Sequence, residues 1–488
     1  MEKDTICAIA TASGGAIGII RVSGSDSIDI TDKIFVSKSG KRLTDSRSYS
    51  LHYGYISDDK GETVDEVMVA TYHSPKSYTG ENSTEIMCHG SGYILQKVTE
   101  LLITNGCRMA TPGEYTQRAF LNGKMDLSQA EAVADLIAAS NYASHKLAMN
   151  QMRGQFSEEL HHLRDQLLEM TSLLELELDF SEEDVEFADR QKLSDLSVRI
   201  ENVISRLTRS FRLGNAIKHG IPVAIIGETN VGKSTLLNQL LHEERAIVSD
   251  VHGTTRDSIE DCVNINGVTF RFIDTAGIRT TDDVIENIGI ERTFSKIKEA
   301  EIVLWLIDAT ELLEHPLESV QEAQAAPPRN EYQGASNIDD IKSRILPFCE
   351  DKSLICVINK CDLIDEDQMY TVYNRIYKDS GINEDETIRI SAKNGMNIAS
   401  LENMLIDASH VSEISDNDIV VTNIRHAESL NNALASIRQV KHSLLQGMSG
   451  DLISEDLRMT IHHLSEIVGD VSSDDVLKSI FSKFCIGK

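Results

Sequence analysis

The spacing of hydrophobic residues changes along the chain and predicts segments of different secondary structure. In residues 1–120, short runs in which apolar and polar residues alternate, such as 17–22 and 64–72, are separated by turns rich in glycine and serine, a pattern typical of strands. Glycines 14, 15 and 18 interrupt the first apolar stretch, which predicts two strands joined by a glycine turn. With one helical stretch near 92–102, the segment is predicted to be an α+β domain.

From about 125 to 215, and again from 424 to 484, apolar residues recur every three or four positions, which predicts long amphipathic helices. Residues 220–410 instead alternate between short apolar runs and helical stretches, the pattern of a parallel sheet covered by helices. We therefore predict an α/β domain inserted into a helical domain. The expected divisions are 1–120 (α+β), 121–215 (first helical part), 216–410 (α/β) and 411–488 (second helical part).

Charge and cysteine content narrow the class of protein. The chain of 488 residues has 47 Lys and Arg against 77 Asp and Glu, a net charge of −30, which opposes simple coating of a phosphate backbone. Segment 216–410 alone holds 18 basic and 34 acidic residues. The eight scattered cysteines lack metal-ligand spacing and are expected to be reduced thiols of a cytoplasmic protein. The longest apolar run, 302–307, is too short to cross a membrane, so no membrane-spanning segment is expected.

Several polar stretches allow more than one interpretation. Residues 175–189 contain eight acidic residues and no basic one, which fits a solvated helix end or linker, or else a docking surface. Residues 315–343 are expected to form a loop insertion at the edge of the α/β domain. The histidine pairs 161–162 and 462–463 are expected on helix surfaces rather than among metal ligands.

A phosphate-binding loop is predicted at residues 227–234, whose sequence GETNVGKS fits G-x-x-x-x-G-K-S. It follows the short apolar strand 222–226 and precedes a helical stretch at 235–241, the context that the motif requires. Backbone N–H groups of such a loop surround a phosphate, Lys233 neutralises β and γ oxygens, and the Ser234 hydroxyl is a ligand for Mg²⁺.

Three later motifs favour guanine nucleotides. Residues 274–277 (DTAG) follow a strand and can hold the Mg²⁺ shell and meet a γ-phosphate. In 359–362 (NKCD), the carboxylate can accept both the ring N–H and the amine of guanine, which adenine does not offer. Residues 391–393 (SAK) complete the base pocket, so the substrate is expected to be GTP. The predicted nucleotide-binding residues are Asn230, Val231, Gly232, Lys233, Ser234, Thr235, Ser249, Asp250, Val251, His252, Gly253, Thr254, Thr255, Asp274, Thr275, Ala276, Gly277, Asn359, Lys360, Asp362, Ser391, Ala392 and Lys393.

The group that promotes hydrolysis is less plain in the sequence. Many small GTPases place a water-orienting Gln after DTAG, but Ile278 stands there and can neither orient water nor accept its proton. Arg256 and Arg279 are candidates for charge stabilisers, and the Asn230 carbonyl is a candidate ligand for a monovalent cation in the same role. In the polar segment 246–257, Thr255 is the candidate for a second Mg²⁺ ligand.

Together these motifs resemble the MnmE (TrmE) family of tRNA modification GTPases. The resemblance includes AIVSDVHGTTRD (246–257) and ENIGIER (286–292) in the α/β segment. Outside it, IGIIRVSG, SYTGENSTEIMCHGSG, TPGEYTQRAFLNGKMDLSQAEAVADLI and the terminal FSKFCIGK also resemble the family, so the resemblance covers essentially the whole chain. It implies a folate-binding-like α+β domain, a helical domain and an inserted Ras-like P-loop GTPase domain.

The resemblance implies a homodimer whose GTPase domains dimerise with potassium. It makes Asn230, Ser249, Val251 and Thr254 the potassium ligands, and Glu286 the catalytic glutamate that activates water through a bridging water. Two departures are Thr229, where related GTPases often have proline, and Ser249, where threonine is frequent.

The resemblance also implies that the N-terminal domain binds formyl-tetrahydrofolate. The residues that match its folate contacts are Arg21, Glu85, Lys124 and the C-terminal Lys488. A carboxylate suits the donor edge of a pterin, and Arg or Lys suits glutamyl carboxylates. Cys485 is then either a thiol close to the folate or a buried inert residue, because a terminal lysine is atypical for prenylation.

The resemblance implies that, with an MnmG-type FAD-dependent flavoprotein in a heterotetramer, the protein adds a carboxymethylaminomethyl-type group to the wobble uridine of certain tRNAs. We expect most tRNA phosphate contacts to come from the partner, given the net charge. One alternative is a ribosome-assembly GTPase of the Era or EngA type, although we find no KH-type module and no basic patch. The other is a folate-dependent transferase that GTP merely regulates.

Overall fold

The computed structural model divides the chain into two compact units, which are described separately. Unit one comprises residues 1–138, 148–206 and 425–488, and unit two comprises residues 139–147 and 207–424. The residues described are 4–12, 14–179, 190–228, 230–243, 261–273, 297–314, 347, 349, 351–380, 382–411, 418–482, 484 and 487. Among them, no helix has the length and apolar character needed to cross a membrane.

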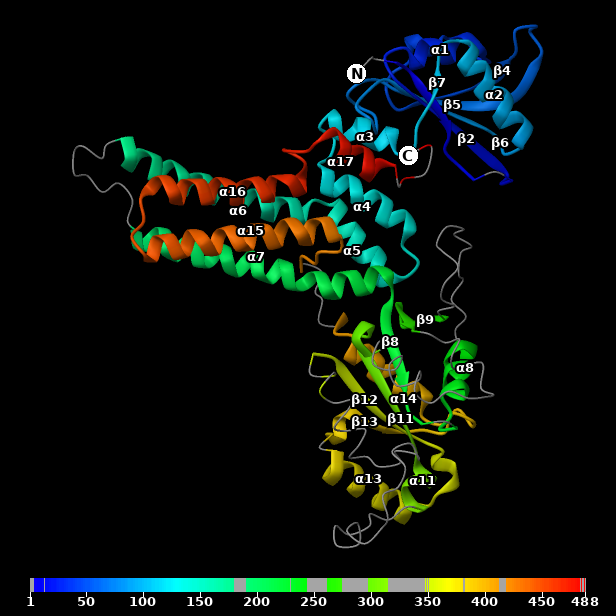
Figure 1. Ribbon diagram of the computed structural model, residues 1–488. Coiled ribbons are helices and arrows are strands. Elements are labelled where there is room, and N and C mark those ends of the chain that lie inside the picture. Colours follow the sequence, from blue (N-terminus) through cyan, green and yellow to red (C-terminus); the bar gives the residue numbers. More distant parts are fainter. Residues whose placement is uncertain are drawn as a thin grey trace. The chain divides into compact units, whose positions relative to one another are not determined.

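The N-terminal part of unit one is a seven-stranded mixed sheet in the order β3-β4-β5-β6-β2-β1-β7. Its pairs are antiparallel except β1 with β7, and β1 and β2 are the two strands expected around the glycine turn. Isoleucines of α1 and leucines of α2 belong to one core shared with the sheet. Figure 1 shows the two helices beside this sheet. The elements are β1 (Ile6–Ile9), β2 (Ile17–Ser23), α1 (Ser27–Ile34), β3 (Phe35–Ser37), η1 (Leu43–Asp45), β4 (Ser50–Ser57), β5 (Thr63–Tyr72), β6 (Ser83–His89), α2 (Gly92–Thr104) and β7 (Arg108–Met109).

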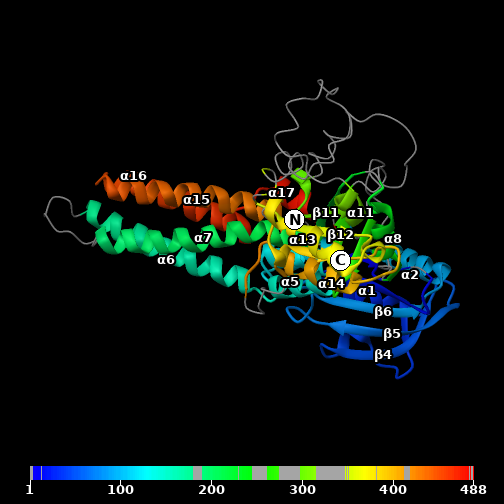
Figure 2. The same cartoon turned by 90° about the horizontal axis from the view of Figure 1, so that it is seen from below.

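Helices make up the rest of unit one. The long helices α6, α15 and α16 and the first part of α7 lie side by side in the two perpendicular views (Figures 1 and 2). At the C-terminus, leucine and phenylalanine side chains of α17 pack with α4. The helices, of which α5 and α7 lie partly in unit two, are α3 (Glu114–Leu121), α4 (Leu127–Ala138), α5 (Tyr142–Met152), α6 (Gln155–Asp179), α7 (Arg190–His219), α15 (Ile424–Leu445), α16 (Gly450–Val468) and α17 (Asp474–Phe481).

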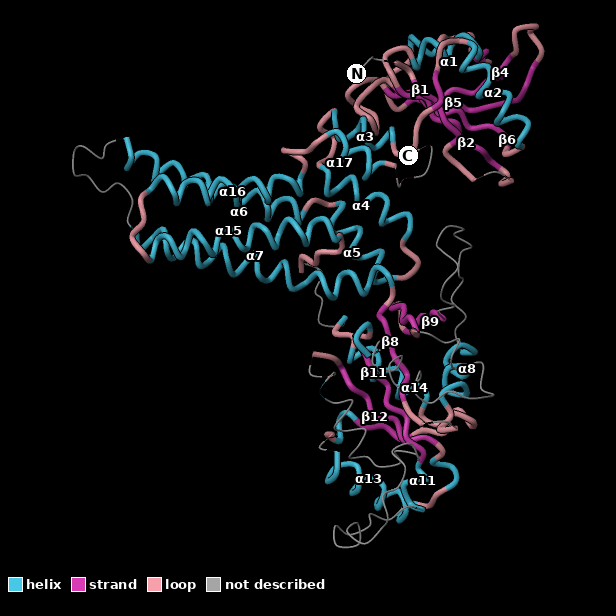
Figure 3. Tube along the Cα trace, in the orientation of Figure 1, coloured by secondary structure: helices cyan, strands magenta, loops and turns pink. Residues whose placement is uncertain are grey.

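Unit two is built on a six-stranded sheet in the order β13-β12-β11-β8-β10-β9 (Figure 3). The sheet is parallel except at one edge, where β9 pairs antiparallel with β10 through a two-residue turn at Asn266 and Gly267. The spacing of apolar residues did not predict this hairpin at the edge of the sheet, because β9 is short and half-exposed. The described elements are β8 (Ile221–Ile226), α8 (Lys233–Glu243), β9 (Asp261–Ile265), β10 (Val268–Phe272), β11 (Ile302–Asp308), α11 (Ala309–Glu314), β12 (Ser353–Asn359), η4 (Cys361–Leu363), α13 (Glu366–Ser380), η5 (Glu384–Glu386), β13 (Thr387–Arg389) and α14 (Ile398–Ala408).

Two apolar cores cover the two faces of this sheet. One core includes residues of α8 and α14, and the other includes residues of α13, while β8 and β11 are buried along their whole length. Strands buried on both faces read as continuous apolar runs, which explains why 222–226 and 302–307 carry no alternation. The prediction of a multidomain chain with α+β, helical and α/β parts is confirmed, whereas its residue boundaries stay predictions.

Candidate functional site

The phosphate-binding loop leaves the buried strand β8 and enters α8, which begins at Lys233. Gly232 has a φ of +99°. A Cβ atom at this position would lie 2.3 Å from the amide nitrogen of Asn359, so glycine is required by both backbone conformation and space. The first turn of α8 directs backbone N–H groups, which have no acceptor within the helix itself, and the positive end of the helix dipole toward this loop. The local geometry is therefore that of an anion site.

Lys233 folds back over the loop. Its ammonium donates hydrogen bonds to the carbonyl oxygens of Gly227 at 2.7 Å and Glu228 at 2.6 Å. A phosphate group in the loop would accept from the same ammonium, which is thus already held where β and γ oxygens are expected. Ser234 and Thr235 follow on the first turn of α8, with Ser234 half-buried and Thr235 exposed.

Asn359 ties two predicted parts of the nucleotide site together. It is the last residue of β12, and its side-chain amide donates to the Val231 carbonyl at 2.7 Å. Its side-chain oxygen accepts from the backbone N–H of Ala392 at 2.9 Å. One buried side chain therefore fixes the phosphate loop against the 391–393 loop, and both are held at the carboxyl edge of the sheet, where ligands bind in open α/β folds.

Next to Asn359, Lys360 has a left-handed φ of +63°, and its ammonium pairs with the carboxylate of Asp308. Asp308 is 2% exposed and also accepts from the backbone N–H and hydroxyl of Thr310, at 2.9 and 2.8 Å. Burial by itself would raise the pKa of Asp308, but the Lys360 and Thr310 hydrogen bonds outweigh burial and lower it. Asp308 therefore carries a buried negative charge beside the base-binding motif.

The remaining base-binding residues lie around this centre. Asp362, in η4, is exposed, so its carboxylate can accept hydrogen bonds from a ligand. Ser391 and Ala392 are buried, and Lys393 is exposed. The fold thus brings 227–234, 359–362 and 391–393 to one edge of one sheet.

Other predicted site residues lie outside the described residues, and the structure says nothing of them. They are Ser249, Asp250, Val251, His252, Gly253, Thr254, Thr255, Arg256, Asp274, Thr275, Ala276, Gly277, Arg279, Glu286, Cys485 and Lys488, and Thr229 also lies outside.

Three of the four predicted folate residues are described, in the N-terminal sheet and beside it. Arg21 on β2 faces Glu85 on β6 in register, and their side chains form an ion pair at 2.8 Å. The Arg21 guanidinium lies over the rings of Tyr78 and Tyr115, at 5.5 and 5.7 Å from their centroids. The site therefore has a paired carboxylate and guanidinium beside aromatic faces.

Lys124 belongs to the same neighbourhood. Its ammonium donates to the Pro75 carbonyl at 3.2 Å, and its stem lies against Gly80, in the loop that also carries Tyr78. Gly487 lies against β1, since an added Cβ would be 2.6 Å from the Ile9 carbonyl.

Sequence reasoning missed Asp308, Thr310 and the aromatic residues around Arg21. The available signal for Asp308 was a polar residue at the end of a buried apolar strand, which in a parallel sheet marks the ligand edge. Tyr78 and Tyr115 gave no such signal, because they are far from Arg21 in the sequence.

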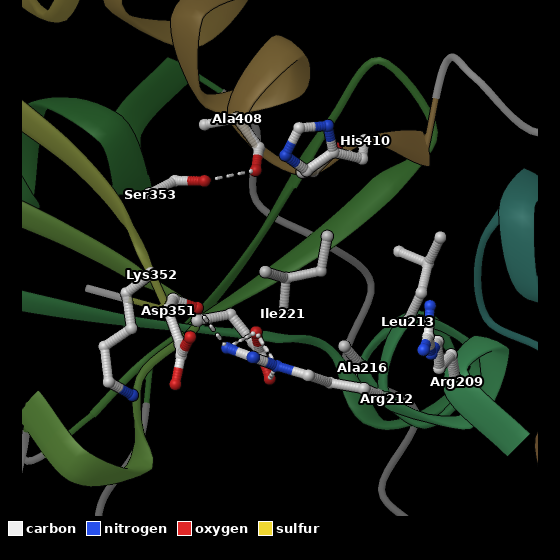
Figure 4. Close-up of a pocket in the computed structure, with 12 residues that line it drawn as sticks. Arg209, Arg212, Leu213, Ala216, Ile221, Asp351, Lys352, Ser353, Ala408 and His410 are labelled. Atoms are coloured by element: carbon white, nitrogen blue, oxygen red, sulfur yellow. Dashed lines mark hydrogen bonds and ion pairs between the residues drawn. The ribbon is translucent and has the colours of Figure 1, made fainter. Parts of the chain in front are cut away.

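A cavity of about 410 Å³ lies at the opposite edge of the unit-two sheet, where β8, β11 and β12 begin. There the Arg212 guanidinium binds both carboxylate oxygens of Glu301, at 2.7 and 2.6 Å, and donates to the Asp351 carbonyl at 2.8 Å (Figure 4). This cavity is separate from the nucleotide edge of the sheet.

Two family models and a set of curated proteins match this chain. The family model "GTP-binding protein TrmE N-terminus" matches residues 5–124, and "MnmE helical domain" matches residues 127–485. Similar curated proteins include the tRNA modification GTPase MnmE of Bacteroides thetaiotaomicron, 56% identical over 100% of both chains, and that of Flavobacterium johnsoniae, 49% identical over 100% of both.

Among solved structures, Aquifex aeolicus Era bound to GDP.AlF4- is 28% identical and covers 44% of this chain and 66% of that one. Its TM-score is 0.27, so we draw no conclusion about this chain from that structure. The chain is, however, similar to MnmE proteins over its full length and matches both family models. It therefore belongs to the MnmE family of tRNA modification GTPases.

Proposed function

We propose that this GTPase works with an MnmG-type flavoprotein to add a carboxymethylaminomethyl-type group to the wobble uridine of certain tRNAs, with formyl-tetrahydrofolate as the source of one carbon. GTP, Mg²⁺ and a role in tRNA modification follow from membership of the family. The observation that carries the finer proposal is the match over the whole length of MnmE proteins, N-terminal domain included.

The N-terminal residues are chemically suited to a folate. Glu85 accepts from Arg21 at 2.9 Å and from the Tyr72 hydroxyl at 3.3 Å, so its carboxylate is held in place by two partners. A pterin presents a row of N–H donors that such a carboxylate can accept. Lys124 and the proposed Lys488 would pair with the glutamyl carboxylates, and the rings of Tyr78 and Tyr115 offer flat apolar surfaces.

In the GTPase domain, we propose that Ser234 and Thr255 bind Mg²⁺ and that Asn230, Ser249, Val251 and Thr254 bind K⁺. Potassium between facing domains would supply the positive charge that stabilises the transition state, while Glu286 activates water through a bridging water. The position of Asn230 supports this assignment, since the residue belongs to the phosphate-binding loop, where it has a φ of +65°.

A homodimer is supported by an apolar face on the N-terminal sheet. Val36, Leu51, Tyr53 and Met68 are 40–52% exposed, and strand register puts them on one face, away from the core under α1 and α2. Exposed apolar side chains gathered on one face of a sheet mark an interaction surface. We propose that a second copy of the chain covers it.

The proposal places the protein in the cytoplasm as part of a heterotetramer with the flavoprotein. The four segments 1–120, 121–215, 216–410 and 411–488 would be folate-binding and dimerisation, helical, GTPase and helical parts. With a net charge of −30, the protein would leave most tRNA phosphate contacts to its partner.

The test uses a strain that lacks this protein, with the wobble uridine of its tRNAs analysed by mass spectrometry. We expect the modification to be lost, restored by the wild-type gene, and not restored by Arg21→Ala. Separately, the purified full-length chain should bind formyl-tetrahydrofolate in calorimetry, and Arg21→Ala should not. The exposed Arg47→Ala, in the loop that precedes β4 of the same domain, is the matched control and should behave as wild type.

Two outcomes would contradict the proposal. Normal wobble uridines together with defective ribosomal subunits would favour an Era-type assembly GTPase. Normal modification in the Arg21→Ala strain, with no folate bound by the wild-type protein, would remove the folate from the reaction.

A further inference from the structure

Two neighbouring strands of the unit-two sheet end on polar residues that lie side by side. Asp308 ends β11 and Asn359 ends β12, and the parallel register pairs them directly. The side chain of Asn359 ties the phosphate loop to the 391–393 loop, as described above. Asp308 instead turns to the residue after its neighbour, Lys360. The strand register thus places two buried polar residues side by side, one that holds the two loops together and one that holds Lys360.

The two carboxylate oxygens of Asp308 have different partners. Thr310 satisfies one carboxylate oxygen from its backbone and its hydroxyl, and the other oxygen pairs with the Lys360 ammonium. The Asp308 side chain is 2% exposed, whereas that of Lys360 is 32% exposed. A buried charge holds the tip of the lysine while its stem stays accessible to a ligand.

A lysine side chain loses rotational freedom when it is fixed, and this loss costs free energy. Here the protein's own Asp308 fixes the ammonium of Lys360, whose backbone has a left-handed φ of +63°. The free energy needed to order the Lys360 side chain is therefore already spent when the protein folds, and it does not weaken nucleotide binding.

We propose that Asp308 is a positioning residue of the nucleotide site, which holds Lys360 in the conformation that receives the guanine nucleotide. The inference goes beyond the tRNA reaction, because it concerns nucleotide affinity alone. Asp308 does not touch the nucleotide and acts through Lys360. Its removal should therefore weaken binding and leave turnover of bound GTP unchanged.

The test is a double-mutant cycle on the full-length protein, with the affinity for fluorescent methylanthraniloyl-GDP and Mg²⁺ as the measurement. Asp308→Asn keeps an oxygen for the Thr310 hydrogen bonds but replaces the charge that holds Lys360. We expect its Kd to rise about tenfold, as when the ordering of one lysine side chain is transferred to binding. In a Lys360→Met background the same substitution should change the Kd less than twofold.

GTP hydrolysis gives a second readout. Over a range of GTP concentrations, Asp308→Asn should show a higher KM. Its kcat should stay the same, because no group that contacts the reacting phosphate has changed. The matched control is Glu301→Gln, since Glu301 is also an ion-paired carboxylate but directly precedes β11, at the far edge of the sheet. It should leave the Kd unchanged.

Two outcomes would overturn the proposal: an unchanged Kd for Asp308→Asn, or an equal loss of affinity in the wild-type and Lys360→Met backgrounds. The latter would mean that Asp308 supports the fold rather than Lys360. If Asp308→Asn does not fold, Thr310→Val takes its place, because it removes one hydrogen bond that orients the carboxylate. It should raise the Kd about threefold only where Lys360 is present.

Discussion

Buried charges in this chain are fixed by partners from distant parts of the sequence. In unit one, Glu131 on α4 accepts from His426 at 2.6 Å and from Arg425 at 2.9 and 3.1 Å, both on α15. The guanidinium of Arg425 also donates to the Glu466 carbonyl, near the end of α16. The Glu131–Arg425 ion pair therefore links three helices. Burial by itself would raise the pKa of Glu131, but His426 and Arg425 outweigh burial and lower the pKa to about 2.

This pKa predicts a pH dependence of stability. Because the folded value is depressed, the stabilisation is present above the unfolded value near 4.5 and is lost as the pH falls toward 2. It amounts to about 3 kcal/mol at neutral pH. We expect Glu131→Gln to lower the helical melting midpoint at pH 7, measured by circular dichroism, and to flatten its fall between pH 5 and pH 2.

Two controls separate this effect from general damage. The exposed Glu428→Gln, on α15, should leave the curve unchanged. The chain has one tryptophan, Trp305, buried in unit two, so its fluorescence midpoint should not follow Glu131→Gln. A pH slope as steep in Glu131→Gln as in wild type would refute the assignment.

At the scale of elements, α7 and the segment before α15 are held together within unit two. Backbone N–H of Val421 donates to the Ser210 hydroxyl at 3.1 Å, one turn of α7 before Gly214. A Cβ on Gly214 would lie 2.2 Å from the Val421 carbonyl. The glycine therefore exists for close packing, although it lowers the intrinsic stability of the helix.

We predict that Gly214→Ala destabilises unit two by about 1–3 kcal/mol, because overpacking outweighs the gain of up to about 1 kcal/mol in helix propensity. The measurement is the unfolding midpoint followed by Trp305 fluorescence. Asn215→Ala, at the next and exposed position of α7, should be neutral or stabilising. A higher midpoint for Gly214→Ala than for wild type would exclude the close contact.

At the scale of the whole molecule, charge and assembly are linked. The segment 216–410 carries more than half of the net charge of −30, and facing copies of such acidic domains repel each other. A cation bound between them would offset part of this repulsion and stabilise the charge that develops on the phosphates. Potassium-dependent pairing of the proposed kind would therefore act on both binding and catalysis.

The prediction is that GTP hydrolysis in K⁺ exceeds that in Na⁺ at equal ionic strength by on the order of tenfold or more. Asn230→Ala should bring the K⁺ rate down to the Na⁺ rate, as measured by phosphate release over a range of protein concentrations. Glu301→Gln, in the same domain but far from the phosphate loop, should keep the difference. Equal rates in the two salts would rule out the potassium role.

The sequence by itself determined the parts of the protein that depend on local pattern. Apolar spacing predicted strands and helices, because burial follows periodicity, and the glycine and lysine positions of 227–234 predicted the phosphate loop, because that loop is a local structure. The family resemblance added Arg21 and Glu85, which spacing alone could not have paired.

The tertiary structure decided which distant side chains meet. Asp308 and Lys360 are 52 residues apart and Glu131 and His426 are 295 apart. Their pairing depends on strand register and helix packing, which a single sequence does not encode in any local pattern. The ionisation of Asp308 and Glu131 depends on burial and on those partners together, so it followed from the fold and could not be read from residue type.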